Sequence, residues 1–219
     1  MKRIGVKKLI SPFISLVFLL TACSTSASPS QISPVTKVTP VETTGPATTS
    51  SESAQNQNFN CSAPATATPA LTEGPYFKTN SPERASLLEP GIAGMKLTLS
   101  GYVLNTDCQP VVGARLDFWQ ADASGQYDNS GYTLRGHQFS DQDGRYQLET
   151  IVPGLYPGRT EHIHVKVNAP NGPGLTTQLF FPGVSQNDQD RIYDPALLLD
   201  IQQAGDGLNA SFNFVVVSN

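Results

Sequence analysis

Short segments in which apolar and polar residues alternate constrain the fold of this 219-residue chain more than any other feature. Met95, Leu97, Leu99 and Val103 alternate with polar residues, which is the pattern of a strand with one buried face. Asp143-Gly144 is a tight-turn signal. Further strands are expected at 114–120, 145–150, 162–167, 175–181 and 212–216, and one short helix at 195–203. Short strands separated by Gly and Pro turns predict an all-β fold, a β-sandwich with one short helix.

The first 22 residues have the features of an export signal. A basic start at Lys2 and Arg3 precedes an apolar run over 9–20 that is too short to span a membrane comfortably. The run ends in Leu20-Thr21-Ala22-Cys23, which resembles the lipobox of bacterial lipoproteins. We therefore expect a signal peptide over 1–22, a lipid on Cys23 and attachment to the bacterial cell envelope outside the cytoplasm; the alternative is an ordinary signal peptide with a chance cysteine.

Composition divides the remainder of the chain into two parts. Residues 23–60 are rich in Ser, Thr and Pro and carry almost no large apolar side chains, so this segment is expected to be a disordered tether. The folded domain is expected over 61–219. The net charge of −4 gives no basic footprint for nucleic acid. The sequence leaves the oligomeric state undetermined.

Three cysteines are present, and Cys23 is assigned to the lipid. Cys61 and Cys108 then form an even pair in an exported and oxidising setting, which favours a disulfide. Two buried free thiols are the alternative.

A His-x-His pattern is the first sign of a metal site. In the strand over 162–167, His162 and His164 share one face while Ile163, Val165 and Val167 share the other. Two imidazoles would therefore point together, away from the core. The pattern alone does not identify the metal, and zinc with Glu161 or Asp141 as a third ligand remains an alternative.

Several segments along the domain together resemble the intradiol ring-cleavage dioxygenases, the family of catechol and protocatechuate dioxygenases. The resemblance covers nearly the whole folded part, in the family's order, and the signal peptide and cysteine pair resemble its exported branch. The segments are 72–77 (Thr-Glu-Gly-Pro-Tyr-Phe), 118–121 (Phe-Trp-Gln-Ala), 132–136 (Tyr-Thr-Leu-Arg-Gly), 141–146 (Asp-Gln-Asp-Gly-Arg-Tyr), 153–157 (Pro-Gly-Leu-Tyr-Pro), 162–164 and 176–179 (Thr-Thr-Gln-Leu).

The resemblance implies a β-sandwich that holds a non-haem Fe(III) ion and cleaves catechol-type rings with O2 to muconate-type dicarboxylic acids. Its implied iron ligands are Tyr132, Tyr156, His162 and His164, hard donors that suit a ferric ion. Tyr127 is a rival for the place of Tyr132, but its spacing to the Asp-x-Asp-Gly turn differs from the family's.

The remaining implied site residues act on the substrate. Arg159 matches an active-site arginine that stabilises negative charge on the substrate ring, and Gln178 matches the glutamine beside it. Tyr156 matches the tyrosinate that leaves when substrate binds, and Tyr76 matches an aromatic residue near the pocket.

Two other classes remain open. The stretch 107–114 followed by 143–146 also resembles transthyretin-like surface domains, sandwiches that would serve as binding modules without a metal. The zinc alternative would make the chain a hydrolase. The sequence does not identify the physiological catechol.

Overall fold

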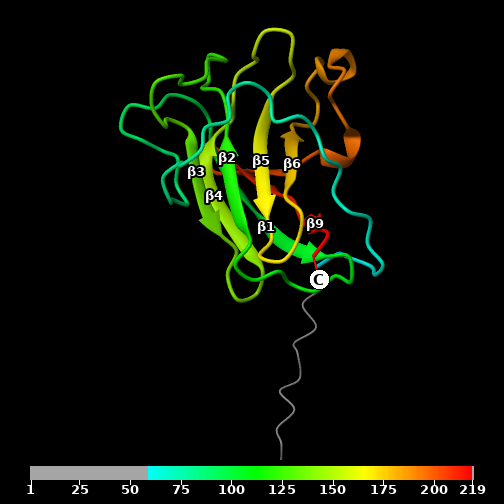
Figure 1. The fold of residues 1–219 in the computed structure, drawn as a ribbon. Coiled ribbons are helices and arrows are strands. Elements are labelled where there is room, and N and C mark those ends of the chain that lie inside the picture. Colours follow the sequence, from blue (N-terminus) through cyan, green and yellow to red (C-terminus); the bar gives the residue numbers. More distant parts are fainter. Residues whose placement is uncertain (1–58, 219) are drawn as a thin grey trace, which may run out of the picture. The chain divides into compact units, whose positions relative to one another are not determined.

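The computed structural model describes residues 59–218, and they form two sheets (Figure 1). The five-stranded sheet has the order β4-β1-β8-β7, with β9 also paired to β1; the four-stranded sheet has the order β3-β2-β5-β6. The strands are β1 (Lys96–Asn105), β2 (Arg115–Trp119), β3 (Arg135–Phe139), β4 (Arg145–Ile151), β5 (His162–Asn168), β6 (Leu175–Phe180), β7 (Asp200–Ala204), β8 (Gly207–Ser211) and β9 (Phe214–Val216). The expected all-β sandwich is confirmed.

The core lies between the two sheets and follows from the alternation along the strands. Leu97 and Leu99 of β1 are at most 1% exposed, as are Ile163 and Val165 of β5. Burying side chains of this kind contributes about 1.5–3 kcal/mol each relative to leaving them in water. The expected strands correspond to β1, β2, β4, β5, β6 and β9, whereas β3, β7 and β8 were not anticipated.

The helix expected at 195–203 is wrong. A single 3-10 turn, η2 (Pro195–Leu197), begins where the Asp194 side chain accepts a hydrogen bond from the Ala196 N–H. The chain then becomes extended at Leu198 and continues into β7, which pairs antiparallel with β8. Leu197 and Leu199 are both buried, with a spacing of two that suits extended chain, and tertiary packing prevails over helix propensity here. The other helical element is the 3-10 turn η1 (Asn187–Gln189).

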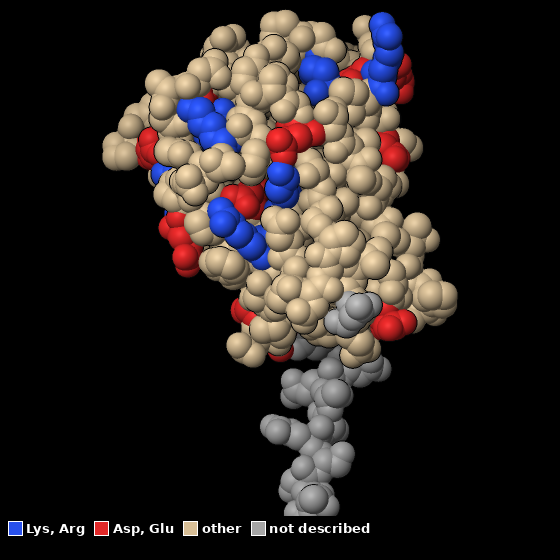
Figure 2. Space-filling view, in the orientation of Figure 1, with Lys and Arg blue, Asp and Glu red and all other residues tan. Residues whose placement is uncertain are grey.

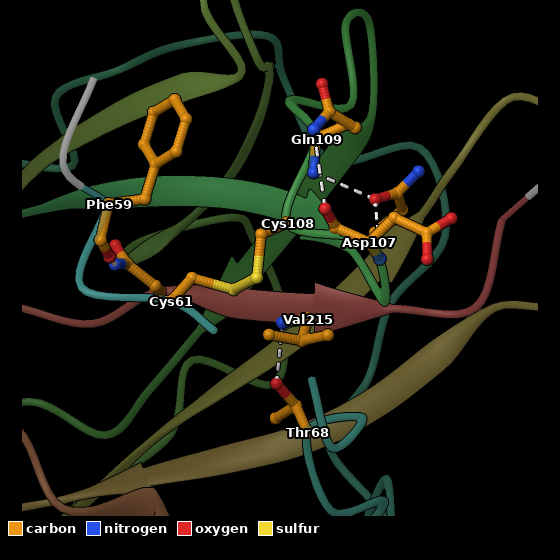
Figure 3. The surroundings of a disulfide bond; sticks show 9 residues. Phe59, Cys61, Thr68, Asp107, Cys108, Gln109 and Val215 are labelled. Atoms are coloured by element: carbon orange, nitrogen blue, oxygen red, sulfur yellow. Dashed lines mark hydrogen bonds between the residues drawn. A yellow bond between two sulfur atoms is a disulfide. The ribbon is translucent and has the colours of Figure 1, made fainter. Parts of the chain in front are cut away.

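A disulfide joins the beginning of the described chain to the turn that follows β1. Cys61 and Cys108 are bonded with their Cα atoms 5.8 Å apart, so the expected pairing is confirmed (Figure 3). Further hydrogen bonds fix the segment after Cys61: Thr68 exchanges two with Val215, through its N–H and its hydroxyl, and Leu71 N–H donates to the Thr176 carbonyl. This segment therefore runs along the domain toward the four-stranded sheet.

Acidic and basic side chains lie side by side on the face in Figure 2, which shows no large patch of one sign.

None of the helical segments within 59–218 is long and apolar enough to cross a membrane. The expected signal peptide, the lipid on Cys23 and all but the last two residues of the tether lie outside the described residues.

Candidate metal and active site

Two histidines stand at the start of β5 on the face turned away from the core. His162 and His164 are 4% and 3% exposed, while Ile163, Val165 and Val167 on the opposite face belong to the core cluster. The division of β5 into an apolar and an imidazole face is therefore as expected from the sequence. Both faces are nevertheless buried, because loops and the N-terminal segment cover the histidines.

The neighbouring strands place two further side chains beside His164. In the register of the sheet, Trp119 at the end of β2 and Gln178 of β6 lie opposite His164. The Trp119 ring stacks on the His164 ring with centroids 4.8 Å apart and planes 9° apart. Gln178 is fully buried. The site therefore lies at the end of the four-stranded sheet where β2 ends and β5 begins.

Both imidazoles are held in the neutral form that binds metals. Burial lowers the pKa of His162 to about 4 and lowers that of His164 well below its usual value. The Nδ1 of His162 lies 2.6 Å from the Thr160 carbonyl, an acceptor, so Nδ1 carries the proton and Nε2 keeps its lone pair. The Nδ1 of His164 is buried without a hydrogen-bond partner among the described residues.

Tyr127 brings its phenol group to the histidines, and Tyr156 lies beside Tyr127. The Tyr127 hydroxyl lies 3.2 Å from His162 Nε2, and its ring lies 5.7 Å from the Tyr156 ring. Tyr76 stacks on Tyr127 with centroids 4.3 Å apart, and its hydroxyl lies 2.8 Å from that of Tyr156. Burial raises the pKa of Tyr127 well above its usual value, so Tyr127 needs a nearby cation to ionise at neutral pH.

The structure does not bring Tyr132 to this cluster. Its hydroxyl donates to the Thr79 carbonyl at 2.9 Å, and its side chain is 38% exposed. The reason is its position in the turn that leads into β3, where its carbonyl accepts from the Arg135 N–H. Tyr132 is the ligand expected from the sequence, whereas in the structure the hydroxyl next to His162 belongs to Tyr127.

Two glycines let the loops that carry Tyr127 and Tyr156 touch through their backbones. The Gly154 N–H donates to the Asp122 carbonyl at 2.8 Å. A Cβ on Gly125, where φ is +80°, would lie 2.1 Å from the Leu155 carbonyl oxygen, and one on Gly154 would lie 2.4 Å from that of Ala123. Only glycine permits this approach, which sets the spacing of the two tyrosines.

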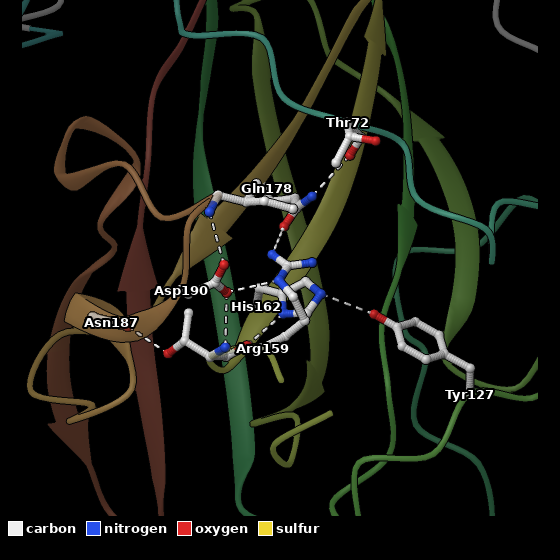
Figure 4. Close-up of polar contacts among 9 residues, drawn as sticks. Thr72, Tyr127, Arg159, His162, Gln178, Asn187 and Asp190 are labelled. Carbon is white, nitrogen blue, oxygen red and sulfur yellow. Dashed lines mark hydrogen bonds and ion pairs between the residues drawn. The ribbon is translucent and has the colours of Figure 1, made fainter. Parts of the chain in front are cut away.

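Arg159 lies next to His162 in a network of hydrogen bonds (Figure 4). Its Nη2 donates to Gln178 Oε1 at 2.6 Å, and Gln178 Nε2 donates to the Thr72 carbonyl at 2.9 Å. Its Nε donates to Asp190 Oδ2 at 2.8 Å. The expected neighbours Arg159 and Gln178 are thus in contact, while Asp190 was not anticipated.

A pocket of about 380 Å³ opens beside these groups. Tyr156, Arg159 and Asp190 line it together with Leu155, Pro157, Gly158, Gln186 and Gln189. It has room for a small aromatic molecule next to a cation.

The donor set fits a ferric ion better than zinc. Two neutral imidazoles lie with two phenols, and phenolate oxygens with imidazoles suit a hard ion such as Fe(III). Within residues 59–218 there is no group of three or more His, Cys, Asp or Glu side chains able to hold a metal. Asp141 instead accepts the N–H groups of Asp143 and Arg145 in a turn, so the described residues supply no third ligand of those types for zinc.

Comparisons with known proteins identify relatives of this domain. A sequence model of a family described as "Dioxygenase" matches residues 72–216. A hydroxyquinol 1,2-dioxygenase from Nocardioides simplex is 32% identical over 165 residues, which cover 64% of this chain and 56% of that protein. The first three curated relatives are matched over 56% to 62% of their length.

Solved structures show the same fold. The dioxygenase domain of a dioxygenase carbohydrate-binding protein fusion from Streptomyces sp. SirexAA-E is 53% identical, with a TM-score of 0.69, over 70% of this chain and 100% of that one. A 3-chlorocatechol 1,2-dioxygenase from Rhodococcus opacus 1CP is 28% identical, with a TM-score of 0.65, over 69% of this chain and 73% of that one. The chain therefore belongs to the intradiol ring-cleavage dioxygenase family.

Proposed function

We propose that this protein is a non-haem Fe(III)-dependent intradiol dioxygenase that opens catechol-type rings with O2 and forms muconate-type dicarboxylic acids. The observation that carries the proposal is the joint position of two neutral imidazoles, two phenols and an arginine at one end of the four-stranded sheet. A surface binding module has no need for such a donor set. Curated relatives of this chain are named as hydroxyquinol and catechol 1,2-dioxygenases.

The iron ligands that we propose are Tyr127, Tyr156, His162 and His164, with Tyr127 in place of Tyr132. When bound there, Fe(III) would supply the Lewis acidity that the reaction of a deprotonated catechol with O2 requires. The Thr160 carbonyl holds His162 so that Nε2 faces the Tyr127 hydroxyl. The buried Trp119 ring fixes the plane of His164.

Tyr156 lies on the substrate side of the proposed iron site, and its hydroxyl is hydrogen-bonded to that of Tyr76. Tyr156 is half-buried and lines the pocket, so of the two phenols it would be the one more accessible to an incoming catechol. Its hydroxyl keeps a hydrogen-bond partner in Tyr76, whose pKa this hydrogen bond raises. Arg159 presents a permanent positive charge to the anionic substrate, and Gln178 holds the guanidinium in place.

Oxygen uptake and product analysis test the proposal. The iron-loaded protein should consume O2 with catechol, a substituted catechol or hydroxyquinol, and both atoms of ¹⁸O2 should enter a product opened between the two hydroxylated carbons. Arg159→Ala should lower turnover far more than iron content, because its charge acts on the substrate. Ring opening beside the hydroxyl pair, or no O2 uptake across the panel, would contradict the proposal.

We also propose that the protein is exported and held at the cell envelope by a lipid on Cys23, which is supported by the Leu20-Thr21-Ala22-Cys23 sequence. A Cys23→Ala variant should be released from the membrane fraction in which the wild type is retained. Equal retention of the two proteins would place the anchor elsewhere.

A further inference from the structure

Asp190 is a nearly buried carboxylate that directly follows η1, outside the set of residues expected from the sequence. Its side chain is 2% exposed. Its Oδ2 accepts from Arg159 Nε at 2.8 Å and from the Thr160 N–H at 3.0 Å, and its Oδ1 accepts from the Ile192 N–H at 2.9 Å. Both oxygens are thus used, and two of the three donors belong to the turn that enters β5.

The segment formed by η1 and Asp190 also holds this turn at a second point, through Asn187. The Thr160 hydroxyl donates to Asn187 Oδ1 at 2.6 Å, and Asn187 Nδ2 donates to the Phe181 carbonyl at 2.9 Å. The Thr160 carbonyl in turn accepts from His162 Nδ1. Figure 4 shows Asn187 and Asp190 on one side of Arg159 and His162.

We propose that Asp190 is a positioning residue that fixes the Arg159 guanidinium for the substrate. This inference rests on the proposed function. An arginine side chain has several rotatable bonds, and one hydrogen bond leaves its plane free to turn. Here Asp190 holds Nε and Gln178 holds Nη2, so two contacts to different nitrogens fix the guanidinium plane. A cation fixed in this way loses no further freedom when a catechol binds.

Positioning and a purely electrostatic role predict opposite changes in catechol affinity when the charge of Asp190 is removed. Asp190 carries negative charge next to Arg159, so removing that charge should strengthen the binding of an anionic catechol if charge alone mattered. If Asp190 acts by positioning, its removal should weaken that binding, because Arg159 then turns away from the substrate.

The test uses Asp190→Asn and a spectral titration of the iron-loaded protein with 4-nitrocatechol. We expect about tenfold weaker binding with unchanged iron content. In an Arg159→Ala background, Asp190→Asn should change the affinity less than about twofold, because a residue that acts through Arg159 has nothing left to position. Asp117→Asn is the matched control: Asp117 is a buried carboxylate paired with Arg115 on β2, and its loss should leave the affinity unchanged.

A second measurement is independent of iron and catechol. In the iron-free protein, the Nε–H of Arg159 should give a slowly exchanging ¹⁵N NMR signal that is lost in Asp190→Asn and retained in Asp117→Asn. If Asp190→Asn does not fold, Asp190→Glu, which keeps the charge but moves the carboxylate, should show the same weaker binding.

Tighter or unchanged binding in Asp190→Asn, an equal loss with and without Arg159, or an Nε–H signal unaffected by Asp190→Asn would overturn the positioning role. A wild-type protein that binds no catechol would instead refute the proposed function, and the NMR comparison would still decide whether Asp190 fixes Arg159.

Discussion

Removal of the Cys61–Cys108 disulfide should destabilise the domain without disturbing the proposed iron site. The bridge closes a loop with a sequence separation of 47 residues. In the chain-entropy description, a loop of this length restricts the unfolded state by about 4 kcal/mol. For a domain of this size, such a loss corresponds to a fall in Tm of roughly 12 °C.

The iron site should survive because the chain between the disulfide and Tyr76 has fixed points of its own. Thr68 is bonded to Val215, Leu71 to Thr176, and the Thr72 carbonyl accepts from Gln178. Loosening the segment near Cys61 therefore leaves the part at the histidines in place.

The assay compares the wild type with a Cys61→Ser/Cys108→Ser variant by thermal unfolding and visible absorption. Reduction of the wild type should give the same fall in Tm as the double substitution. A double variant whose free energy of unfolding is within about 1 kcal/mol of that of the wild type would refute the entropic reasoning. Loss of the visible absorption of the iron-loaded protein at room temperature would refute the independence of the site from the disulfide.

Two further predictions concern the loops and the histidines. Gly125→Ala should destabilise the protein by more than about 2 kcal/mol and release iron, because its Cβ would meet the Leu155 carbonyl and separate Tyr127 from Tyr156. The control is Gly113→Ala, at a position with a similar positive φ but open space around it, which should cost only about 1 kcal/mol and keep iron. Equal effects of the two substitutions would contradict the explanation. The iron-free protein should lose about 3 kcal/mol of stability as the pH falls from about 6.5 to about 4, because His162 is protonated at a higher pH in the unfolded chain than in the folded protein. In urea unfolding, the free energy of unfolding of a His162→Gln variant should fall less steeply with pH over this range. An identical pH dependence in the two proteins would contradict the explanation.

The sheets could be predicted from the sequence where one face of a strand packs into the hydrophobic core. The alternation in β1 and β5 is clear because the core takes every second side chain. It is weak in β7, in which no residue is fully buried, and the apolar run at 195–199 then suggested a helix. Gly205-Asp206 connects β7 to β8 as a two-residue hairpin, a turn signal that could have identified both strands.

The choice between Tyr127 and Tyr132 depended on topology, which spacing along the chain does not reveal. β2 runs antiparallel to β5 with Trp119 opposite His164, so the loop after Trp119 starts beside the histidines. Tyr127 lies in that loop, whereas Tyr132 lies where the chain returns to β3. Asp190 was beyond prediction for a similar reason, since its contact with Arg159 joins positions 31 residues apart through a loop without a regular pattern.

The visible spectrum of a matched pair of variants tests the central claim most directly. Tyrosinate bound to Fe(III) absorbs visible light, so the iron-loaded wild type should be coloured. Tyr127→Phe should shift or weaken the band, because it removes a hydroxyl that lies 3.2 Å from His162. Tyr132→Phe, which removes a hydroxyl bonded to the Thr79 carbonyl, should leave the band unchanged. A band that responds to Tyr132→Phe and not to Tyr127→Phe would contradict the account.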